Sequence, residues 1–540
     1  MPGRTEPHGS SPHLPGTTML TLALSLALLP FQSTVTRDVN WEIILPFGAL
    51  PGTVYGWGLQ SRKADHATVA ISSDRHVLVA YHTDRSDIGA PFNLKQVEAA
   101  MFRYNEFTDD WTHVQTELVG GVEHFPLDPL YVQSYGTKCE RPDVIAVGDR
   151  FFVTCTRIYD RTTRAEEPSI SEGTWVTWDA LQQRFMVHGG GALGLGFPLD
   201  FDNNDHDNNM LTQPTSLFVR ECAGVSDVVV LRENLNGVST VGVAYAHQSD
   251  FGDYPAVDNT RRCDLRFVSC TFDGTTITNN VPQVVQASIP FDGVTGAGGS
   301  GSSAGLILPD LARGYADGRI VLVYEEQQFV SPTSSDAYGL IRLQGWQYDF
   351  VTQALPLLPS YSHTIGSATT PFTRRRPNVS SRPSPGGTVD EFTLAFNKEL
   401  ANGDQDVVYE QWQFSESGGY RVPWPAGEGW FNPPPSPPNM YLINDFRPIP
   451  LHGTTIPFSR RCLAERDLGN GTCQILEYAM DTDPENNGNP LVLASGPSLG
   501  RPAASYWYQA GAPSPHYAVV TWEGPGVVQT GLKIWIRVRE

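Results

Sequence analysis

Arginine, histidine, tyrosine and glutamate side chains recur at two points of a repeated sequence phrase. Copies of the phrase begin at His66, Arg141, Gln213, Arg376 and Arg501, with a further copy at Leu308. Near the ends of these copies lie Tyr81 and His82, Arg157, Tyr245 and His247, Glu325, and Glu523. A guanidinium is planar and can bind a carboxylate or sulfate through two parallel hydrogen bonds. Histidine and tyrosine side chains can donate or accept a proton. These residue types predict a site that binds an anion and transfers a proton beside it.

Two reactions suit this set of side chains. In β-elimination an arginine neutralises the carboxylate of a uronate sugar, which acidifies the adjacent carbon for a histidine or tyrosine base. The candidate bases are His66, Tyr81, His82, Tyr245 and His247, and the candidate anion ligands are Arg141, Arg157, Arg376 and Arg501. In hydrolysis two carboxylates, from among Glu325, Glu326 and Glu523, would act as acid and base if they lie opposite each other across a sugar. Elimination is the favoured reaction and hydrolysis the second choice.

Each arginine also has a purely structural interpretation. An Arg-Pro pair can start a strand with its guanidinium stacked on a neighbouring sheet or paired with a nearby carboxylate. The binding interpretation requires at least one guanidinium that faces the cavity.

An acidic segment, LDFDNNDHDNN at 199–209, is a candidate metal site. It carries Asp200, Asp202, Asp205 and Asp207 among four asparagines. Hard oxygen ligands at alternate positions suit Ca²⁺, although the segment lacks the central Gly and terminal Glu of an EF-hand loop. The expected role is a structural calcium that clamps a loop, and the alternative is a solvated polar loop. No organic cofactor is expected, because the chain has no G-x-x-x-x-G-K-[ST] loop and its glycine-rich stretch GVTGAGGSGSSAG at 293–305 has no lysine and follows no Rossmann unit.

The phrase itself predicts two strands joined by a short turn. Its clearer copies are HATVAISSDRHVLVAYHTD, RPDVIAVGDRFFVTCTRIYD, LPDLARGYADGRIVLVYEEQ, RPNVSSRPSPGGTVDEFTLAFNKE and RPAASYWYQAGAPSPHYAVVTWEG. The copy from Gln213 is looser, and an additional hairpin is expected in it through VGVAYAHQSD. A third strand and usually a fourth follow each copy, and four antiparallel strands are the composition of a β-propeller blade.

The chain is therefore predicted to be all-β, with a single β-propeller of seven four-stranded blades over residues 34–540. One degenerate blade is expected near 438–500. The last copy has only three strands in sequence, so the N-terminal strand NWEIILPF at 40–47 is expected to complete the last blade and close the ring. A pair of β-sandwich domains is the alternative. In a blade the first strand begins where the second ends, which would bring both sets of residues to one rim.

Residues 1–33 read as a signal peptide and N-terminal tail, because Met19–Phe31 is an apolar run of signal-peptide length. Export is consistent with seven cysteines. Near-neighbour disulfides are plausible for Cys139 with Cys155, Cys263 with Cys270 and Cys462 with Cys473, which would leave Cys222 odd, although sequence does not fix the connectivity. Cys263 and Cys270 lie at opposite ends of one expected strand, a span too long for a bond if the strand is straight.

The net charge narrows the choice of partner. With 37 Lys and Arg against 58 Asp and Glu, the formal charge is −21, which repels nucleic acid and anionic lipid. No membrane span is expected, because the apolar run is too short to cross a bilayer. The expected protein is a secreted monomer whose partner is an anionic polysaccharide.

The start x-P-x-φ and the end φ-φ-φ-Y/W-x-E/H-x of the phrase resemble those of sialidase-like propellers and of the seven-bladed ulvan-lyase-like polysaccharide lyases. The lyase resemblance implies a His/Tyr pair for proton abstraction, with Arg binding the uronate. The sialidase resemblance implies an arginine triad, a Tyr–Glu pair and repeated S-x-D-x-G-x-T-W boxes, of which CTFDGTTIT at 270–278 is a partial copy.

Three functions are compatible with these patterns. The favoured one is a secreted enzyme that binds and cleaves an acidic glycan, either uronate-containing or sulfated. The second is a non-catalytic extracellular propeller that binds glycan or protein. The third is a propeller oxidoreductase or lactonase with a metal at the channel, which the arginine-rich strand starts argue against.

Overall fold

The structure is a computed structural model, and it describes the strands and short turns of the chain. The described residues are 39–42, 63–84, 95–105, 110–120, 135–161, 169–188, 197–198, 222–248, 260–293, 309–314, 316–329, 337–366, 373–383, 390–399, 405–415, 418–421, 429–430, 442–448, 451–452, 461–468, 470–479, 491–507, 517–525 and 532–539. The regular elements within these ranges are all β-strands, so the all-β prediction is confirmed.

The strands form antiparallel four-stranded units, each named here by its first strand. The β2 unit contains β2 (Lys63–Ile71), β3 (His76–Asp84), β4 (Lys95–Asn105) and β5 (Asp110–Gly120). The β6 unit contains β6 (Tyr135–Val147), β7 (Arg150–Arg161), β8 (Ser169–Asp179) and β9 (Arg184–His188). The β11 unit contains β11 (Cys222–Leu235), β12 (Val238–Gln248), β13 (Thr260–Phe272) and β15 (Gln283–Gly293).

The remaining units repeat this meander. The β16 unit contains β16 (Asp310–Arg313), β17 (Arg319–Phe329), β18 (Ala337–Gln347) and β19 (Leu357–Ile365). The β20 unit contains β20 (Thr373–Pro383), β21 (Asp390–Glu399), β22 (Gln405–Ser415) and β23 (Gly418–Arg421). The β25 unit contains β25 (Leu442–Pro448), β27 (Arg461–Asp467), β28 (Cys473–Ala479) and β29 (Leu491–Gly496).

The β30 unit joins strands from the two ends of the described chain. It contains β30 (Gly500–Trp507), β31 (Tyr517–Pro525), β32 (Leu532–Arg539) and β1 (Val39–Glu42), where β1 pairs antiparallel with β32. Short strands flank the units: β10 (Phe197–Pro198), β14 (Ile277–Asn279), β24 (Gly429–Trp430) and β26 (Leu451–His452). Of the expected strand 40–47, residues 40–42 pair with the last sheet as part of β1, and residues 43–47 lie outside the described residues.

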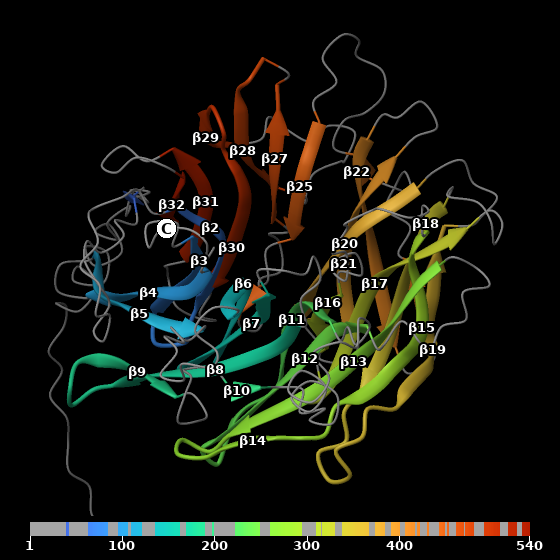
Figure 1. Cartoon of the computed structure of the whole chain (residues 1–540), viewed down its shortest axis with the longest axis horizontal. Helices are drawn as coiled ribbons and strands as arrows, with labels where there is room; N and C mark the ends of the chain where they lie inside the picture. The colour runs from blue at the N-terminus through green and yellow to red at the C-terminus, as the bar shows by residue number, and fades with distance from the viewer. Residues whose placement is uncertain are drawn as a thin grey trace, which may run out of the picture.

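Hydrogen bonding joins the described strands into five sheets rather than into seven separate ones. The reason is that the first three units are fused by two short parallel contacts, Lys95 with Lys138 and Cys222 with Ser169. The units stand around a common centre in chain order, and the blue β2 lies beside the red β30 (Figure 1). This arrangement is a β-propeller.

Apolar side chains fill the spaces between neighbouring units. One cluster joins the β2 and β6 units, and others join β6 to β11, β11 to β16, β16 to β20 and β25 to β30. Because each sheet packs on both faces, a second strand can be apolar at every position rather than at alternate ones. In β3 the whole run from Val77 to Tyr81 is at most 1% exposed.

The prediction for the copy at Gln213 assigned the wrong runs of residues to its first and second strands. An additional hairpin through VGVAYAHQSD would make DVVVLREN the second strand of that copy. Instead DVVVLREN lies in β11, the first strand, and VGVAYAHQ lies in β12, the second strand. Within the described residues 222–248 these two runs form a single hairpin. Gln213 itself lies outside the described residues. The pattern misled because both strands are buried apolar runs.

The predicted disulfides are also wrong. Cys155, Cys270 and Cys473 are thiols. In sheet register Cys139 faces Arg157, two residues beyond Cys155, and Cys473 faces Asp467, five residues beyond Cys462. Cys263 and Cys270 lie in one strand, about 23 Å apart along it. Each pair is thus separated by more than a disulfide spans.

Among the described residues, no helix has the length and apolar character needed to cross a membrane.

Candidate functional site

The repeated phrase starts at a β-bulge in the first strand of a unit. The pairing of first and second strands shifts register between Asp65 and Thr68, and the same shift occurs at four other units: between Glu140 and Asp143, Ala223 and Ser226, Arg375 and Asn378, and Gly500 and Ala503. The residues inside these bulges include His66, Arg141, Arg376 and Arg501. A bulge bends its strand and re-aims its side chains. Four predicted site residues therefore occupy equivalent backbone positions.

These bulges lie near one edge of the propeller, here called the first-strand rim, where first strands begin and second strands end. At the residue before the bulge, Asp65 pairs with His82, Ala223 with His247, and Gly500 with Glu523. Arg157 is one residue further along β7, opposite Cys139. Strand register thus places the two predicted sets of residues at the same rim.

His66, Arg501 and Glu523 are in direct contact at this rim. The backbone N–H of His66 donates to Oε1 of Glu523 at 2.6 Å. Arg501 Nη1 donates to the same Oε1 at 3.3 Å and to Nδ1 of His66 at 2.7 Å. Glu523 is buried, whereas the Arg501 side chain is 46% exposed. One buried carboxylate thus holds a half-exposed guanidinium against an imidazole from the other end of the chain.

Both residues have strained backbones. His66 has φ of 51° and Arg501 has φ of 47°, in the left-handed region that non-glycine residues rarely adopt. Such a conformation costs about 1–3 kcal/mol and persists only where the surroundings enforce it. Here a carboxylate accepts each strained N–H, namely the buried Glu523 for His66 and the partly exposed Glu465 for Arg501 at 3.1 Å. Glu465 lies on β27 in the neighbouring unit, and no sequence pattern singled it out.

Three predicted site residues lie in the interior. Tyr81 and Tyr245 are 0% exposed, and Glu325 is 6% exposed. The hydroxyl of Tyr81 donates to Glu98, which is itself buried. Tyr245 also packs in the cluster between the β6 and β11 units. The role of these tyrosines as bases on a bound glycan stays a prediction.

The side chains of Arg141, Arg157, Arg376, His82 and His247 lie outside the described residues, although their strands are described. Asp200, Asp202, Asp205 and Asp207 lie wholly outside them, so the structural calcium stays a prediction.

A second set of carboxylates, which sequence reasoning missed, joins first strands of adjacent units. Each carboxylate accepts a hydrogen bond from a backbone N–H of the next unit. The donors are Val228 to Asp143 at 3.2 Å, Leu311 to Asp227 at 2.5 Å, and Val379 to Asp310 at 2.9 Å. Burial, then the carboxylates of Asp310 and Asp143, raise the pKa of Asp227 well above its ordinary value. Asp follows Pro in both the RPD and LPD copies, and this shared position was the available signal.

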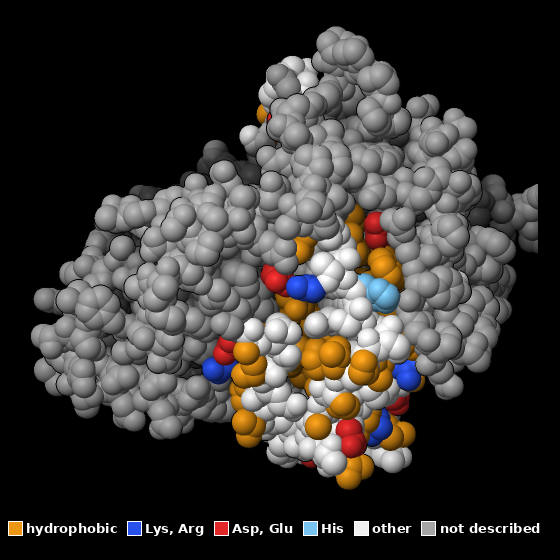
Figure 2. All heavy atoms as spheres, turned by 90° about the vertical axis from the view of Figure 1, so that its right-hand side faces the viewer, with side chains coloured by type: hydrophobic (Ala, Val, Ile, Leu, Met, Phe, Trp, Pro, Cys, Tyr) orange, Lys and Arg blue, Asp and Glu red, His pale blue; other side chains and the backbone are white. Residues whose placement is uncertain are grey.

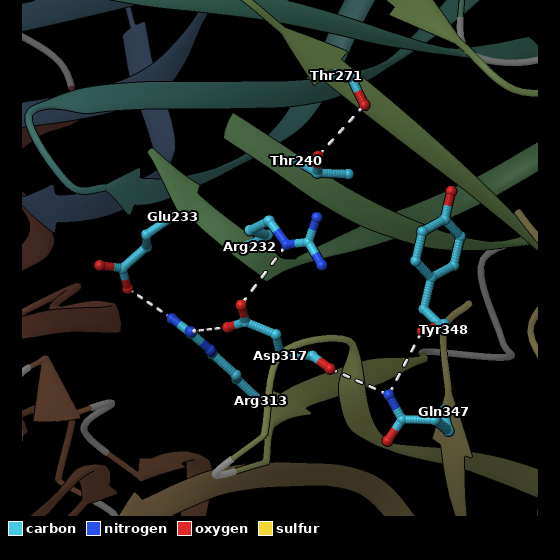
Figure 3. A network of polar contacts seen from close by, with 8 residues as sticks. All are labelled: Arg232, Glu233, Thr240, Thr271, Arg313, Asp317, Gln347 and Tyr348. Carbon is cyan, nitrogen blue, oxygen red and sulfur yellow. Dashed lines mark hydrogen bonds and ion pairs between the residues drawn. The ribbon is translucent and has the colours of Figure 1, made fainter. Parts of the chain in front are cut away.

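The opposite edge, at the turns between first and second strands, carries ion pairs between the β11 and β16 units (Figure 3). Arg313 donates to Glu233 at 2.5 Å and to Asp317 at 3.1 Å, and Arg232 lies 3.5 Å from Asp317. These carboxylates are about half exposed. Here the guanidinium of Arg313 is matched by two acids, unlike that of Arg501.

The described surface on the right-hand side of Figure 1 does not present charge of one sign. Figure 2 shows hydrophobic side chains there, with basic and acidic side chains interspersed at the margins. That described area therefore offers no basic patch for a polyanion.

No family model matches the sequence, and no curated protein matches it. Among solved structures, the chain is similar to a protein of unknown function from Dyadobacter fermentans, with 12% identity, 94% of this chain and 99% of that chain covered, and a TM-score of 0.37. It is similar to an α-L-arabinanase of Penicillium chrysogenum, with 11% identity, coverage of 93% and 98%, and a TM-score of 0.33. The intramolecular trans-sialidase of Ruminococcus gnavus shares 8% identity over 85% and 90% of the two chains, with a TM-score of 0.33.

Proposed function

We propose that this protein is a secreted β-propeller that binds an acidic glycan, uronate-containing or sulfated, at the first-strand rim and cleaves it by β-elimination. The observation that supports this proposal is the contact between Arg501, His66 and Glu523. A guanidinium held by a buried acid, half exposed and beside an imidazole, suits a bound carboxylate or sulfate.

Arg501 retains donors for such an anion. Among the described residues, its side-chain hydrogen bonds all come from Nη1, which leaves Nε and Nη2 for a ligand. Glu523 is the acid that balances its charge, and the guanidinium remains the more exposed partner. An anion bound there would gain charge-assisted hydrogen bonds without displacing the structural contact.

The proposed reaction uses the anion contact to acidify the substrate. With the uronate carboxylate held by Arg501, a histidine of the rim takes the proton from C5. The electron pair forms the C4–C5 double bond, the bond from C4 to the glycosidic oxygen breaks, and that oxygen receives a proton. Two sugar chains result, one of which carries an unsaturated uronate.

The proposal includes the complete ring. Seven blades would be the units described above, with the β30 unit closing against the β2 unit. The hydrogen bonds from His66 to Glu523 and from Ile71 N–H to Ser505 at 3.2 Å support this closure. Residues 1–33 would serve as the export signal.

The test is incubation of the purified chain with uronate-containing and sulfated polysaccharides, followed by ultraviolet absorbance. Elimination gives a conjugated product that absorbs, while hydrolysis gives reducing ends without that absorbance. Binding is measured in parallel by calorimetry. The proposal would be overturned if the protein neither bound nor cleaved any of the acidic glycans tested.

A non-catalytic glycan-binding propeller is the second candidate. The burial of Tyr81 and Tyr245 favours it, because the rim loses two of its predicted bases. Saturable binding of an acidic glycan without any product would support this candidate over the enzyme.

A further inference from the structure

We infer that Glu465 is a positioning residue of the rim site, which acts on a bound anion only through Arg501, by holding the strained backbone of that residue. Glu465 lies on β27, in the unit next to the β30 unit that carries Arg501. The effect on a glycan rests on the proposed function, because it needs a ligand at Arg501. The hold on the Arg501 backbone rests on the contacts alone.

The first step is the support of the Arg501 backbone. Arg501 lies inside a bulge, so it has no partner residue in the pairing of β30 with β31. Its N–H instead donates to Oε2 of Glu465 at 3.1 Å, and its φ is 47°. A left-handed conformation persists only where the surroundings enforce it. The carboxylate of Glu465 therefore stabilises this conformation of Arg501.

The second step is the fit of Glu465 against Gly500. A Cβ built on Gly500 would lie 3.0 Å from Oε2 of Glu465, which is tighter than ordinary van der Waals contact. A side chain at residue 500 would therefore push the carboxylate away from the N–H of Arg501. Glycine at this position allows Glu465 to reach its donor.

The third step is that two acids hold different parts of Arg501. Glu465 accepts the backbone N–H, while Glu523 accepts from Nη1 of the guanidinium at 3.3 Å. The described hydrogen bonds of the guanidinium go to Glu523 and His66. Glu465 thus fixes the direction in which the Arg501 side chain leaves its strand, and the guanidinium keeps donors for a ligand.

The same arrangement occurs between the β30 and β2 units. There Glu523 accepts the N–H of His66 at 2.6 Å, and His66 has φ of 51°. In both places a glutamate of a second strand accepts the N–H of the bulge residue in the next unit. Among the described non-glycine residues with positive φ, His66 and Arg501 are the two that lie inside strands. The strained conformation therefore occurs together with its glutamate acceptor.

The charge of Glu465 acts against an anionic ligand. A carboxylate close to Arg501 repels a bound carboxylate or sulfate. If Glu465 acted through its charge alone, its removal would tighten binding. Positioning has the opposite sign, because loss of the acceptor lowers the fraction of molecules in which Arg501 is directed at the ligand. Variants of Glu465 can therefore separate the two effects.

The first test needs no glycan. The full chain is labelled with ¹⁵N-arginine, and exchange of the Arg501 amide with deuterium is followed by nuclear magnetic resonance. The Arg501 signal is identified by its loss in Arg501→Lys. Glu465→Ala should speed this exchange by about tenfold, the scale of one lost hydrogen bond, whereas Glu465→Gln keeps an acceptor and should retain slow exchange. Equal exchange in Glu465→Ala and the unaltered protein would overturn the inference, whatever the protein binds.

The second test measures binding of a uronate oligosaccharide by calorimetry. Glu465→Gln removes the charge and keeps an acceptor, so its affinity should equal or exceed that of the unaltered protein. Glu465→Ala should weaken binding about tenfold. Gly500→Ala should weaken it less, because the carboxylate is displaced but not removed. Glu233→Ala at the opposite edge is the control for loss of one negative charge. Unchanged or tighter binding by Glu465→Ala would contradict a positioning role.

Coupling to Arg501 distinguishes positioning from a general structural role. In an Arg501→Ala background, Glu465→Ala should cause no further loss of affinity, because the residue through which it acts has been truncated. Additive losses would refute the inference. Circular dichroism confirms that each variant is folded. Should Glu465→Ala not fold, Gly500→Ala takes its place in the exchange test, where an unchanged rate would have the same meaning. If the unaltered protein binds no acidic glycan, the proposed function fails, and the exchange test still decides the hold on Arg501.

Discussion

The backbone N–H of His66 donates to Oε1 of Glu523 over 2.6 Å, although the two residues are 457 positions apart in the chain. The first described bulge of the propeller is thereby tied to the second strand of the β30 unit. Arg501 joins the same oxygen at 3.3 Å, so the candidate site is assembled from both ends of the chain. Its geometry therefore depends on how the β2 and β30 units meet.

Glu523 is expected to matter for stability as well as for binding. Glu523→Ala leaves the His66 N–H without its acceptor, and this should lower the free energy of unfolding by about 1–3 kcal/mol. Glu523→Gln retains an oxygen acceptor and should lose less. The measurement is denaturant unfolding, with the exposed Glu233→Ala as control, for which about 0–1 kcal/mol is expected. Equal losses for Glu523→Ala and Glu233→Ala would contradict the assigned role.

Arg501→Ala should weaken binding of uronate oligosaccharides by at least about tenfold, because the loss of a charge-assisted hydrogen bond exceeds about 1.4 kcal/mol. Arg501→Lys should recover only part of the affinity, since an ammonium cannot form the bidentate contact. The matched control is Arg313→Ala at the opposite edge, where the guanidinium is already paired with Glu233 and Asp317. Calorimetry at two salt concentrations measures both effects. Comparable losses for Arg313→Ala and Arg501→Ala would place the glycan elsewhere.

Asp227 should make stability depend on pH. Burial and the nearby carboxylates raise its pKa in the folded protein, so protonation favours the folded state. This contribution is complete below the unfolded pKa of about 3.9 and is lost as the pH rises through the folded pKa. Asp227→Asn keeps an oxygen for the Leu311 amide and does not titrate. Its free energy of unfolding relative to the unaltered protein should therefore increase from pH 4 upward. A difference that is constant between pH 4 and 8 would refute this explanation.

Gly242 should not tolerate a methyl group. A Cβ there would overlap Phe267, whose Cε2 lies 2.6 Å from the ideal Cβ position, and Phe267 packs between the β11 and β16 units. Gly242→Ala is expected to reduce the free energy of unfolding by about 1–3 kcal/mol through overpacking. Gly496→Ala serves as control, since the nearest atom there, Cδ1 of Leu499, is 4.0 Å away. Thermal unfolding of both variants gives the comparison, and equal midpoints would show that Phe267 can move aside.

The repeated phrase was sufficient to predict the strand pairs, because each copy contains two buried runs joined by a turn. It also identified the bulge residues His66 and Arg501, since each begins a copy. The phrase could not show whether Tyr81 is buried in the interior or exposed at the first-strand rim. Both faces of β3 are buried between neighbouring sheets, so alternation of polar and apolar residues, the usual guide to orientation, is absent there.

The register of the Gln213 copy failed for a related reason. β11 and β12 are both apolar, and β11 is interrupted by three shifts of register, so the sequence contains no marker of which strand comes first. The disulfide pairs failed because proximity in sequence says little about register across a sheet. Cys462 and Cys473 are close in the chain but five residues apart in pairing.

By itself the sequence determined the all-β class, the repeating strand pairs and the kinds of side chain at the two ends of each pair. These features follow from local composition and spacing, which every copy carries within its own residues. Only the tertiary structure decided that His66, Arg501 and Glu523 meet, that Glu465 supports them, and that Tyr81 and Tyr245 do not join them. Those contacts depend on which units become neighbours and on the pairing register within each sheet, and both are set by packing between segments far apart in the chain.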